Sequence, residues 1–270
     1  LPHAARRPRR RRRSGAPACA GVTEAMLIYG FHAVLARLRR APAGVRELYV
    51  DARREDVRVR DLLRVAEAAG VRAHFVDADR LERLCPHKRH QGVVALVEAP
   101  PKGQRLDELL DAHENGAEPI LLLVLDGVTD PRNLGACLRV ADGAGAAAVI
   151  APKDRACALT EIAMQTASGA AESVPYLMVT NLARALDEIR DRGIFVVGTD
   201  ERASVGLYEQ RLEGPLAWVL GAEGTGMRRL TRERCDALVR IPMRGAVGSL
   251  NVSVAAGVVL YETLRQRGAG

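Results

Sequence analysis

The second half of the chain alternates between short, fully apolar runs and longer amphipathic stretches. The apolar runs cover residues 120–125, 147–150, 194–197, 216–220 and 237–241. Continuous apolar runs of this length are typical of parallel strands that are covered on both faces. Helical spacing is found over residues 134–142, 159–168, 182–192, 228–234 and 250–267. The pattern therefore predicts an α/β domain with a mostly parallel sheet over residues 119–270.

Residues 26–98 repeat this alternation on a smaller scale. Helical patterns cover residues 29–38, 61–69 and 79–84, and Gly70 is a natural C-terminal stop for the second of them. Strand-like runs cover residues 47–50, 71–76 and 92–97. We therefore predict a separate small α/β domain in front of the larger one.

The segments outside these two domains differ from them in composition. Residues 99–118 contain Pro100, Pro101 and Gly103, a helix-like piece over residues 106–113 and a net charge of −3, which predicts a linker. Residues 1–25 carry seven arginines and no apolar run of about 7–15 residues, so they do not resemble a secretory signal. We expect residues 1–25 to be a disordered, Arg-rich tail.

The net charge is distributed unevenly along the chain. The chain has a net charge of +7, but residues 119–270 are neutral and residues 26–98 carry +4. A basic front domain is suited to contact phosphates. The candidates for this contact are Arg37, Arg39, Arg40, Arg53, Arg54, Arg58, Arg60, Lys88 and Arg89, with Gln91 as a further polar candidate. Aromatic residues are only 3% of the chain, which disfavours a base-stacking platform.

The cysteine pattern and the hydropathy of the chain indicate its cellular location and whether it binds a metal or spans a membrane. Five cysteines occur without a C-x-x-C pair, which indicates reduced thiols and a cytoplasmic location. The segment from Cys85 to His90 could be half of a metal site, but the chain lacks a second cluster, so we expect a polar loop and no metal. No run approaches the ~18 apolar residues that cross a membrane.

The candidate chemistry follows the predicted strands. Residues 133–139 (NLGACLR), 220–227 (LGAEGTGM) and 241–251 (IPMRGAVGSLN) each come after an apolar run. In a parallel sheet these loops meet at the carboxyl edge, where ligands bind. The sequence contains neither a dinucleotide fingerprint nor a phosphate loop. A cofactor would therefore be recognised by backbone N–H and C=O groups of the loops, which can approach it closely at glycines such as Gly221, Gly224, Gly226, Gly245 and Gly248. Glycines that only mark turns remain the alternative for each position.

The three loop sequences resemble the three motifs of the SpoU/TrmH branch of the SPOUT methyltransferases, over residues 26–267. The run LDGVTDPRNLGACLR at residues 125–139 and the run RRLTRERCD at residues 228–236 are especially specific. The resemblance implies a trefoil-knotted catalytic domain, a homodimer with the last helix in its interface, and a front domain like an RNA-binding ribosomal protein. It also implies S-adenosylmethionine (SAM) as cofactor, near Thr199, Leu220, Gly221, Ile241, Met243 and Leu250.

By the same resemblance, Arg139 activates a ribose 2′-hydroxyl for attack on the methyl group. An arginine of ordinary pKa is a poor base, so we expect it to stabilise the developing alkoxide and a neighbouring phosphate while water completes proton removal. An arginine that contacts solvent or phosphate is the alternative for an isolated helical position.

Four further residues are expected in the active site. Glu223 either orients Arg139 or accepts from the substrate, and a carboxylate that bonds loop N–H groups is equally compatible with its position. Asn133 either supports the loop or the ribose, or caps a helix. Ser249 is expected to be the N-cap of the last helix, with Asn251 in its first turn. The resemblance assigns Asn133, Glu223, Ser249 and Asn251 to the site together with Arg139.

The expected function is therefore 2′-O-methylation of a guanosine ribose in 23S rRNA. One alternative is the same reaction on tRNA. Another is a noncatalytic RNA-binding factor of ribosome assembly that keeps the scaffold; the presence of all motif residues disfavours it.

Overall fold

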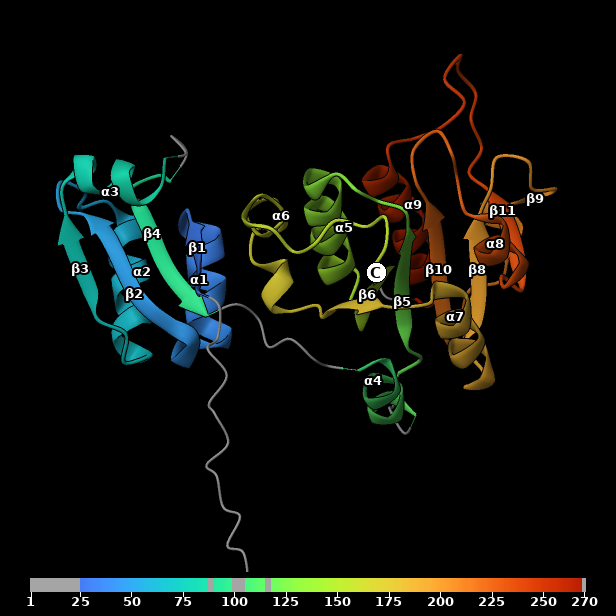
Figure 1. Cartoon of the computed structure of the whole chain (residues 1–270), viewed down its shortest axis with the longest axis horizontal. Coiled ribbons are helices and arrows are strands. Elements are labelled where there is room, and N and C mark those ends of the chain that lie inside the picture. Colours follow the sequence, from blue (N-terminus) through green and yellow to red (C-terminus); the bar gives the residue numbers. More distant parts are fainter. Residues whose placement is uncertain (1–24, 87–89, 99–104, 115–117, 269–270) are drawn as a thin grey trace, which may run out of the picture.

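The structure is a computed structural model that describes residues 25–86, 90–98, 105–114 and 118–268. The Arg-rich tail up to residue 24, Lys88, Arg89 and part of the predicted linker lie outside the described residues. Two sheets organise the described chain, a four-stranded sheet near the N-terminus and a seven-stranded sheet after residue 120 (Figure 1). The α/β class and the division into a small and a large sheet are confirmed.

The front sheet has the strand order β1-β4-β2-β3 and is mixed. β4 pairs antiparallel with both β1 and β2, whereas β2 and β3 are parallel. Its strands are β1 (Ala25–Tyr29), β2 (Val45–Asp51), β3 (Ala73–Val76) and β4 (Val93–Glu98). Its helices are α1 (Phe31–Arg40), α2 (Val57–Ala68) and α3 (Ala78–Leu84), with a 3₁₀ turn at Pro42–Gly44.

The prediction of a helix from residue 29 was wrong at its start. Residues 25–29 form β1 instead, and Met26 lies opposite Val97 of β4. Gly30 has a φ of 85° and separates the strand from α1. This backbone conformation disfavours a side chain, so the glycine lets the chain turn from strand to helix within one residue.

The large sheet is wholly parallel and has the order β7-β6-β5-β10-β8-β11-β9. The strands are β5 (Leu121–Asp126), β6 (Ala148–Pro152), β7 (Tyr176–Val179), β8 (Phe195–Thr199), β9 (Val205–Gly206), β10 (Leu216–Gly221) and β11 (Ala237–Arg240). The sequence pattern missed β7 and β9. β7 is a short apolar run of four residues (YLMV) with one fully buried residue, Leu177, and β9 is only two residues long.

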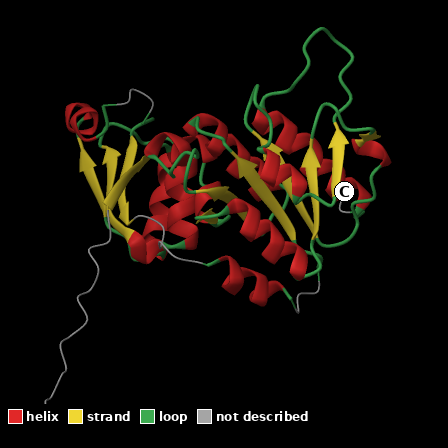
Figure 2. Cartoon of the chain, turned by 45° about the vertical axis from the view of Figure 1, so that its right-hand side comes forward, coloured by secondary structure: helices red, strands yellow, loops and turns green. Residues whose placement is uncertain are grey.

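Helices cover both faces of the large sheet (Figure 2). They are α4 (Leu106–His113), α5 (Pro131–Gly143), α6 (Glu161–Ala167), α7 (Leu182–Asp191), α8 (Arg229–Glu233) and α9 (Val252–Gln266), with 3₁₀ turns at Ala170–Glu172 and Leu207–Glu209. Leu121, Leu123 and Leu125 of β5 pack in the core with α5 and α9, whereas Leu122 and Val124 pack in the core with α4 and α7. Burial of both faces is the reason why the strand reads as an unbroken apolar run.

The front domain packs against the domain of the large sheet through α6 and the turn Ala170–Glu172. The core of the front sheet and the core under α5 form one continuous hydrophobic cluster. The Tyr29 hydroxyl bonds Gln165 of α6, and Arg37 Nη1 lies 2.5 Å from Glu172 Oε2. Figure 1 places α6 between α5 and the front domain. Contacts of this kind hold the two sheets in one arrangement.

Arg37 was expected to contact phosphates, and the structure contradicts this. Its side chain is only 4% exposed, and its Nη2 also donates to the Glu98 carbonyl at 2.8 Å. Arg54 is engaged as well, with Asp56 and over the Phe31 ring, whereas Arg39, Arg58 and Arg60 remain exposed. Among the described residues, no helix has the length and apolarity that a membrane span requires.

Candidate active site

Loops from four strands meet at the carboxyl edge of the large sheet. Because every strand pair is parallel, the ends of β5, β8, β10 and β11 lie on the same side. The loops begin after Asp126, Thr199, Gly221 and Arg240. Residues about 100 positions apart are thereby brought together, as the sequence pattern predicted.

Glu223 is the centre of a hydrogen-bonded cluster at this edge. Its Oε1 accepts from Asn133 Nδ2 at 3.1 Å, from Asn251 Nδ2 at 2.7 Å and from the backbone N–H of Val252 at 3.2 Å. Asn251 Nδ2 also donates to Asn133 Oδ1 at 2.9 Å. Three of the expected site residues, one from each motif, therefore join the β5–α5, β10–α8 and β11–α9 connections.

The contacts of Glu223 in the described chain match one of its expected roles, that of a loop carboxylate. It bonds amide groups, one of them a backbone N–H, and has no bond to Arg139. Asn133 is not the cap of α5, because Asp130 accepts from the Arg132 N–H in that position. Asn133 instead lies within the first turn of α5 with its amide turned to the other two loops.

The expectation for the start of the last helix was wrong by two residues. Asn251, not Ser249, is the N-cap of α9, and its Oδ1 accepts from the Ser253 N–H at 2.9 Å. Ser249 is exposed and lies in the preceding loop. Asn251 can cap the helix through its oxygen while its nitrogen binds Glu223 and Asn133, so a single amide serves both purposes.

A buried carboxylate that the sequence analysis did not single out holds the loop after β10. Asp126 ends β5, its side chain is 0% exposed, and it accepts from Arg228 Nε at 2.6 Å and from the Arg228 N–H at 2.8 Å. The two bonds tie the far end of the glycine loop to the edge of β5. The sequence feature that could have identified Asp126 is an acidic residue at the end of an otherwise apolar run.

Gly221 is required by close packing inside this loop. A Cβ at Gly221 would lie 2.1 Å from the carbonyl carbon of Gly226 and 2.2 Å from the Met227 nitrogen. The loop folds back at this point, with the Gly226 N–H donating to the Ala222 carbonyl at 2.9 Å. Gly224 and Gly226 have φ values of 78° and 67°, which glycine adopts without strain.

We expect Gly221→Ala to destabilise the protein by about 1–3 kcal/mol, because the obstructing atoms are backbone and must shift. Urea denaturation measures the change. Gly214→Ala is the matched control, since an added Cβ there meets nothing within 4 Å, and it should be nearly neutral. Equal effects of the two substitutions would contradict the packing argument.

Cys137 lies beneath the cluster in α5 and is completely buried. Burial, reinforced by the negative charge of Glu223, raises the pKa of its thiol to about 12. The thiol therefore stays protonated in the folded protein at neutral pH. A protonated buried thiol is a packing group and not a nucleophile.

This pKa shift predicts an alkaline loss of stability. The unfolded thiol ionises near its ordinary pKa of 9.0, whereas the pKa of the folded thiol is about 12, so the free energy of unfolding falls as pH rises above 9. The slope contributed by this group approaches ~1.4 kcal/mol per pH unit. Urea denaturation between pH 8 and 11 measures it, and Cys137→Ala should make the profile shallower. An identical slope in that variant would contradict the assignment.

Arg139 lies on the exposed side of α5 and, within the described chain, has no hydrogen-bond or ion-pair partner. It is six residues beyond Asn133, about 9 Å along the helix axis. One turn further, a Cβ at Gly143 would lie 2.9 Å from the Tyr261 hydroxyl, so α5 and α9 are close together there. Arg139 is therefore beside the surface of α9 and not inside the Glu223 cluster.

The expected cofactor residues surround the same edge with differing exposure. Leu220 is buried in the core, so only its backbone is available, and Thr199 and Ile241 are half-buried. Residues 242–249, including Met243, are exposed, and this connection extends away from the sheet in Figures 1 and 2. Added Cβ atoms at Gly224, Gly245 and Gly248 would meet nothing within 4 Å, so a ligand can approach the backbone at these glycines.

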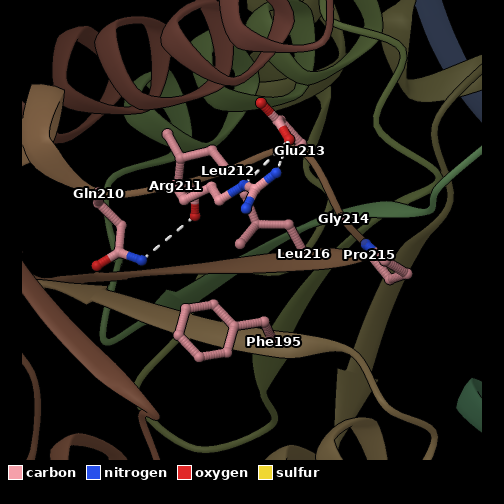
Figure 3. A pocket seen from close by; sticks show the side chains of 8 residues that line it. All are labelled: Phe195, Gln210, Arg211, Leu212, Glu213, Gly214, Pro215 and Leu216. Atoms are coloured by element: carbon pink, nitrogen blue, oxygen red, sulfur yellow. Dashed lines mark hydrogen bonds and ion pairs between the residues drawn. The ribbon is translucent and has the colours of Figure 1, made fainter.

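A hollow lies elsewhere on the large sheet. It measures about 560 Å³ and is lined by Phe195 and by residues 210–216, at the amino ends of β8 and β10 (Figure 3). This is the edge opposite to the motif loops. Within the described residues, no group of three His, Cys, Asp or Glu side chains is arranged to hold a metal ion.

A parallel sheet whose carboxyl-edge loops carry three motifs defines this chain as an α/β protein with a ligand site outside its strand ends. Residues 120–261 match the SpoU rRNA methylase family, and residues 27–103 match the RNA 2′-O ribose methyltransferase substrate-binding family. The chain belongs to the SpoU rRNA methylase family.

Relatives and solved structures agree with this membership. The chain is 57% identical to the 23S rRNA (guanosine-2′-O-)-methyltransferase RlmB of Ralstonia nicotianae, over 91% of this chain and 98% of the relative. It is 53% identical to the RlmB of Neisseria meningitidis, over 89% and 95%. The AviRb SpoU methyltransferase of Streptomyces viridochromogenes, solved in complex with AdoMet, superposes with a TM-score of 0.73 at 28% identity, over 91% of this chain and 92% of that chain.

Proposed function

We propose that this protein is a SAM-dependent methyltransferase that transfers a methyl group to the 2′-hydroxyl of a guanosine in 23S rRNA. The observation that carries the proposal is the cluster of Asn133, Glu223 and Asn251, which joins all three family motifs at one edge of the sheet. The choice of guanosine and of 23S rRNA comes from the names of the relatives, which are 51–57% identical to this chain over nearly its whole length.

The roles of the residues follow from where they lie. Bound SAM supplies an activated methyl group, and backbone groups of Leu220, Gly221, Ile241 and Leu250, with Thr199 and Met243, would surround it. The Glu223 cluster holds the motif loops in position for this ligand. Ser249 and the amides of Asn133 and Asn251 would contact the ribose. A preorganised loop arrangement of this kind lowers the cost of aligning the hydroxyl with the methyl group.

Arg139 would stabilise the alkoxide that forms as the 2′-hydroxyl loses its proton, and water would accept that proton. A guanidinium at this position has five N–H donors and no acceptor, which suits it to an oxyanion and a phosphate and not to proton abstraction. Its lack of a carboxylate partner in the described chain leaves these donors available to substrate.

A homodimer would complete the site. Val254 and Tyr261, 52% and 54% exposed, form an apolar stripe on α9. Arg139 is one turn from Gly143, which packs beside Tyr261. A second copy seated on this stripe would therefore lie against Arg139 and could bring its own motif loops towards the guanidinium. The trefoil knot of the catalytic domain and a cytoplasmic location belong to the same proposal.

The test is methyl transfer to RNA. Purified protein with radiolabelled SAM should label protein-free 23S rRNA or a large-subunit precursor particle, and nuclease mapping should place the label on a guanosine ribose. Labelling of tRNA in place of rRNA would favour the alternative substrate. SAM binding without transfer to any RNA would favour a noncatalytic assembly factor.

A further inference from the structure

Most cations of the large domain are engaged with the protein itself, and the exceptions gather at one edge. Between residues 118 and 268, the partnered side chains bond carboxylates or backbone carbonyls; they are Arg190, Arg192, Arg202, Arg211, Arg228, Arg229, Arg232, Arg234, Arg240, Arg265 and Arg267. The side chains without such a bond in this range are Arg132, Arg139, Lys153, Arg155, Arg184 and Arg244. Arg132 and Arg139 lie on α5, Arg184 lies in the first turn of α7, and Lys153, Arg155 and Arg244 lie on connections that leave the carboxyl edge.

Four of these cations form a row along adjacent strands, which we call the edge row: Arg132, Lys153, Arg155 and Arg184. Arg132 follows β5, Lys153 and Arg155 follow β6, and Arg184 follows β7, and these three strands are neighbours in the sheet. Strands are ~4.8 Å apart, so the strand ends below the row span about 10 Å. All four side chains are exposed.

Two cations of the edge row stand where they do not stabilise their own helices. Arg132 and Arg184 lie in the first turns of α5 and α7, neither of which has an acidic residue in that turn. The positive end of the helix dipole disfavours a cation there. The carboxylates nearest in the chain do not neutralise the row: Asp130 caps α5, and Asp154 bonds neither of its neighbours.

The backbone at Arg155 is also unfavourable for its own residue type. Its φ is 59°, a left-handed conformation that glycine or asparagine adopts more easily than arginine. The loop is nevertheless held in place, because the Cys157 N–H donates to the Val128 carbonyl at 2.9 Å, which joins it to the loop after β5. The charge of an exposed arginine in such a position does not stabilise the folded protein.

We propose that the edge row binds phosphates of the RNA strand next to the target ribose, so that the catalytic domain itself holds the substrate. This inference rests on the proposed function. It adds a second RNA contact surface, on the large domain, to the one expected on the front domain. The row starts beside Asn133 in α5, and it runs towards α6, which packs on the front domain. Cations that follow strand ends about 5–10 Å apart suit the repeating charge of a backbone, whereas a single small anion would use only one or two of them.

The test compares two double variants that each remove two positive charges. Lys153→Ala/Arg155→Ala removes the middle of the edge row. Arg105→Ala/Arg211→Ala is the control, because both arginines are exposed and lie away from the carboxyl edge, on α4 and before β10. RNA affinity is measured by filter binding of 23S rRNA from 50 to 200 mM salt, and SAM affinity by calorimetry.

The edge-row variant should bind RNA about tenfold more weakly, with the salt slope of log K reduced by about 1.4, or 0.7 per lost phosphate contact. The KM for RNA should rise far more than kcat falls, and SAM affinity should not change. Unchanged RNA affinity and salt slope, or an equal loss in both double variants, would overturn the inference. Failure of the wild-type protein to methylate RNA would instead count against the proposed function, since RNA binding is measured separately.

Arg155→Gly separates phosphate binding from a structural role. Glycine accepts the φ of 59° without strain, so the melting temperature should stay equal or rise, while RNA affinity falls severalfold. A loss of RNA affinity that occurs only together with a loss of melting temperature would overturn the assignment of Arg155.

Discussion

Arg139→Ala is expected to lower the rate of methyl transfer by about 10²–10³-fold, the cost of removing one donor to a developing oxyanion. SAM affinity should change little, because the cofactor residues lie on other loops. Single-turnover transfer from radiolabelled SAM to 23S rRNA measures the rate, and calorimetry measures SAM binding. The physical reason is that the guanidinium has no partner in the described chain and is therefore available to stabilise the alkoxide and an adjacent phosphate.

Arg139→Lys and Arg211→Ala are the controls for this result. Lysine keeps the charge but not the planar fork of donors, so it should restore only part of the rate. Arg211 is 84% exposed, ion-paired with Glu213 and lies at the opposite edge, so its loss should leave the rate unchanged. A near-normal rate for Arg139→Ala would remove Arg139 from the reaction and would leave the cluster of Asn133, Glu223 and Asn251 without a charged partner for the substrate.

Arg37→Met is expected to destabilise the protein by about 3–5 kcal/mol, because it leaves a buried carboxylate without its cation. Glu172 is only 5% exposed and Arg37 only 4%, and the pair joins the front domain to the turn before β7. Loss of the bond to the Glu98 carbonyl adds to the cost. Urea denaturation measures the free energy of unfolding.

The double variant Arg37→Met/Glu172→Met should recover most of that loss, since replacing both members of a buried pair with apolar groups is often neutral. Arg64→Met is the surface control; it breaks a pair with Asp61 in which the two side chains are 79% and 56% exposed, and it should cost less than ~1 kcal/mol. Equal costs for Arg37→Met and Arg64→Met would show that the ion pair between the domains does not stabilise the fold.

Much of the fold could be predicted because both faces of the large sheet are buried. Alternate residues of β5 and β10 enter two different cores, so these strands are apolar throughout and easily recognised. β7 was missed although its sequence, YLMV, is also apolar, and three of its four residues are only half-buried. The start of α9 was misplaced by two residues because Ser249 and Asn251 are both good N-caps, and only the bonds of Asn251 to Glu223 and Asn133 distinguish them.

The same limit applies to the candidate site. Asn133, Glu223 and Asn251 were recognised from their motifs, but the sequence could not say that Glu223 binds the two amides and not Arg139. Asp126 was overlooked because a carboxylate at the end of an apolar run has no partner nearby in the chain; its partner, Arg228, is about 100 residues away. Arg37 was read as a phosphate contact for the same reason, since Glu172 is 135 residues distant.

The sequence by itself determined most of the helices and strands, the edge of the sheet where the motif loops meet and the family motifs, because these depend on local periodicity and on short runs of residues. Only the tertiary structure decided which polar groups are partners: the amides for Glu223, the guanidinium for Asp126, and Glu172 for Arg37. Such pairs form between residues 28–135 positions apart, and the free energy of burying a charge depends on the partner that folding brings to it.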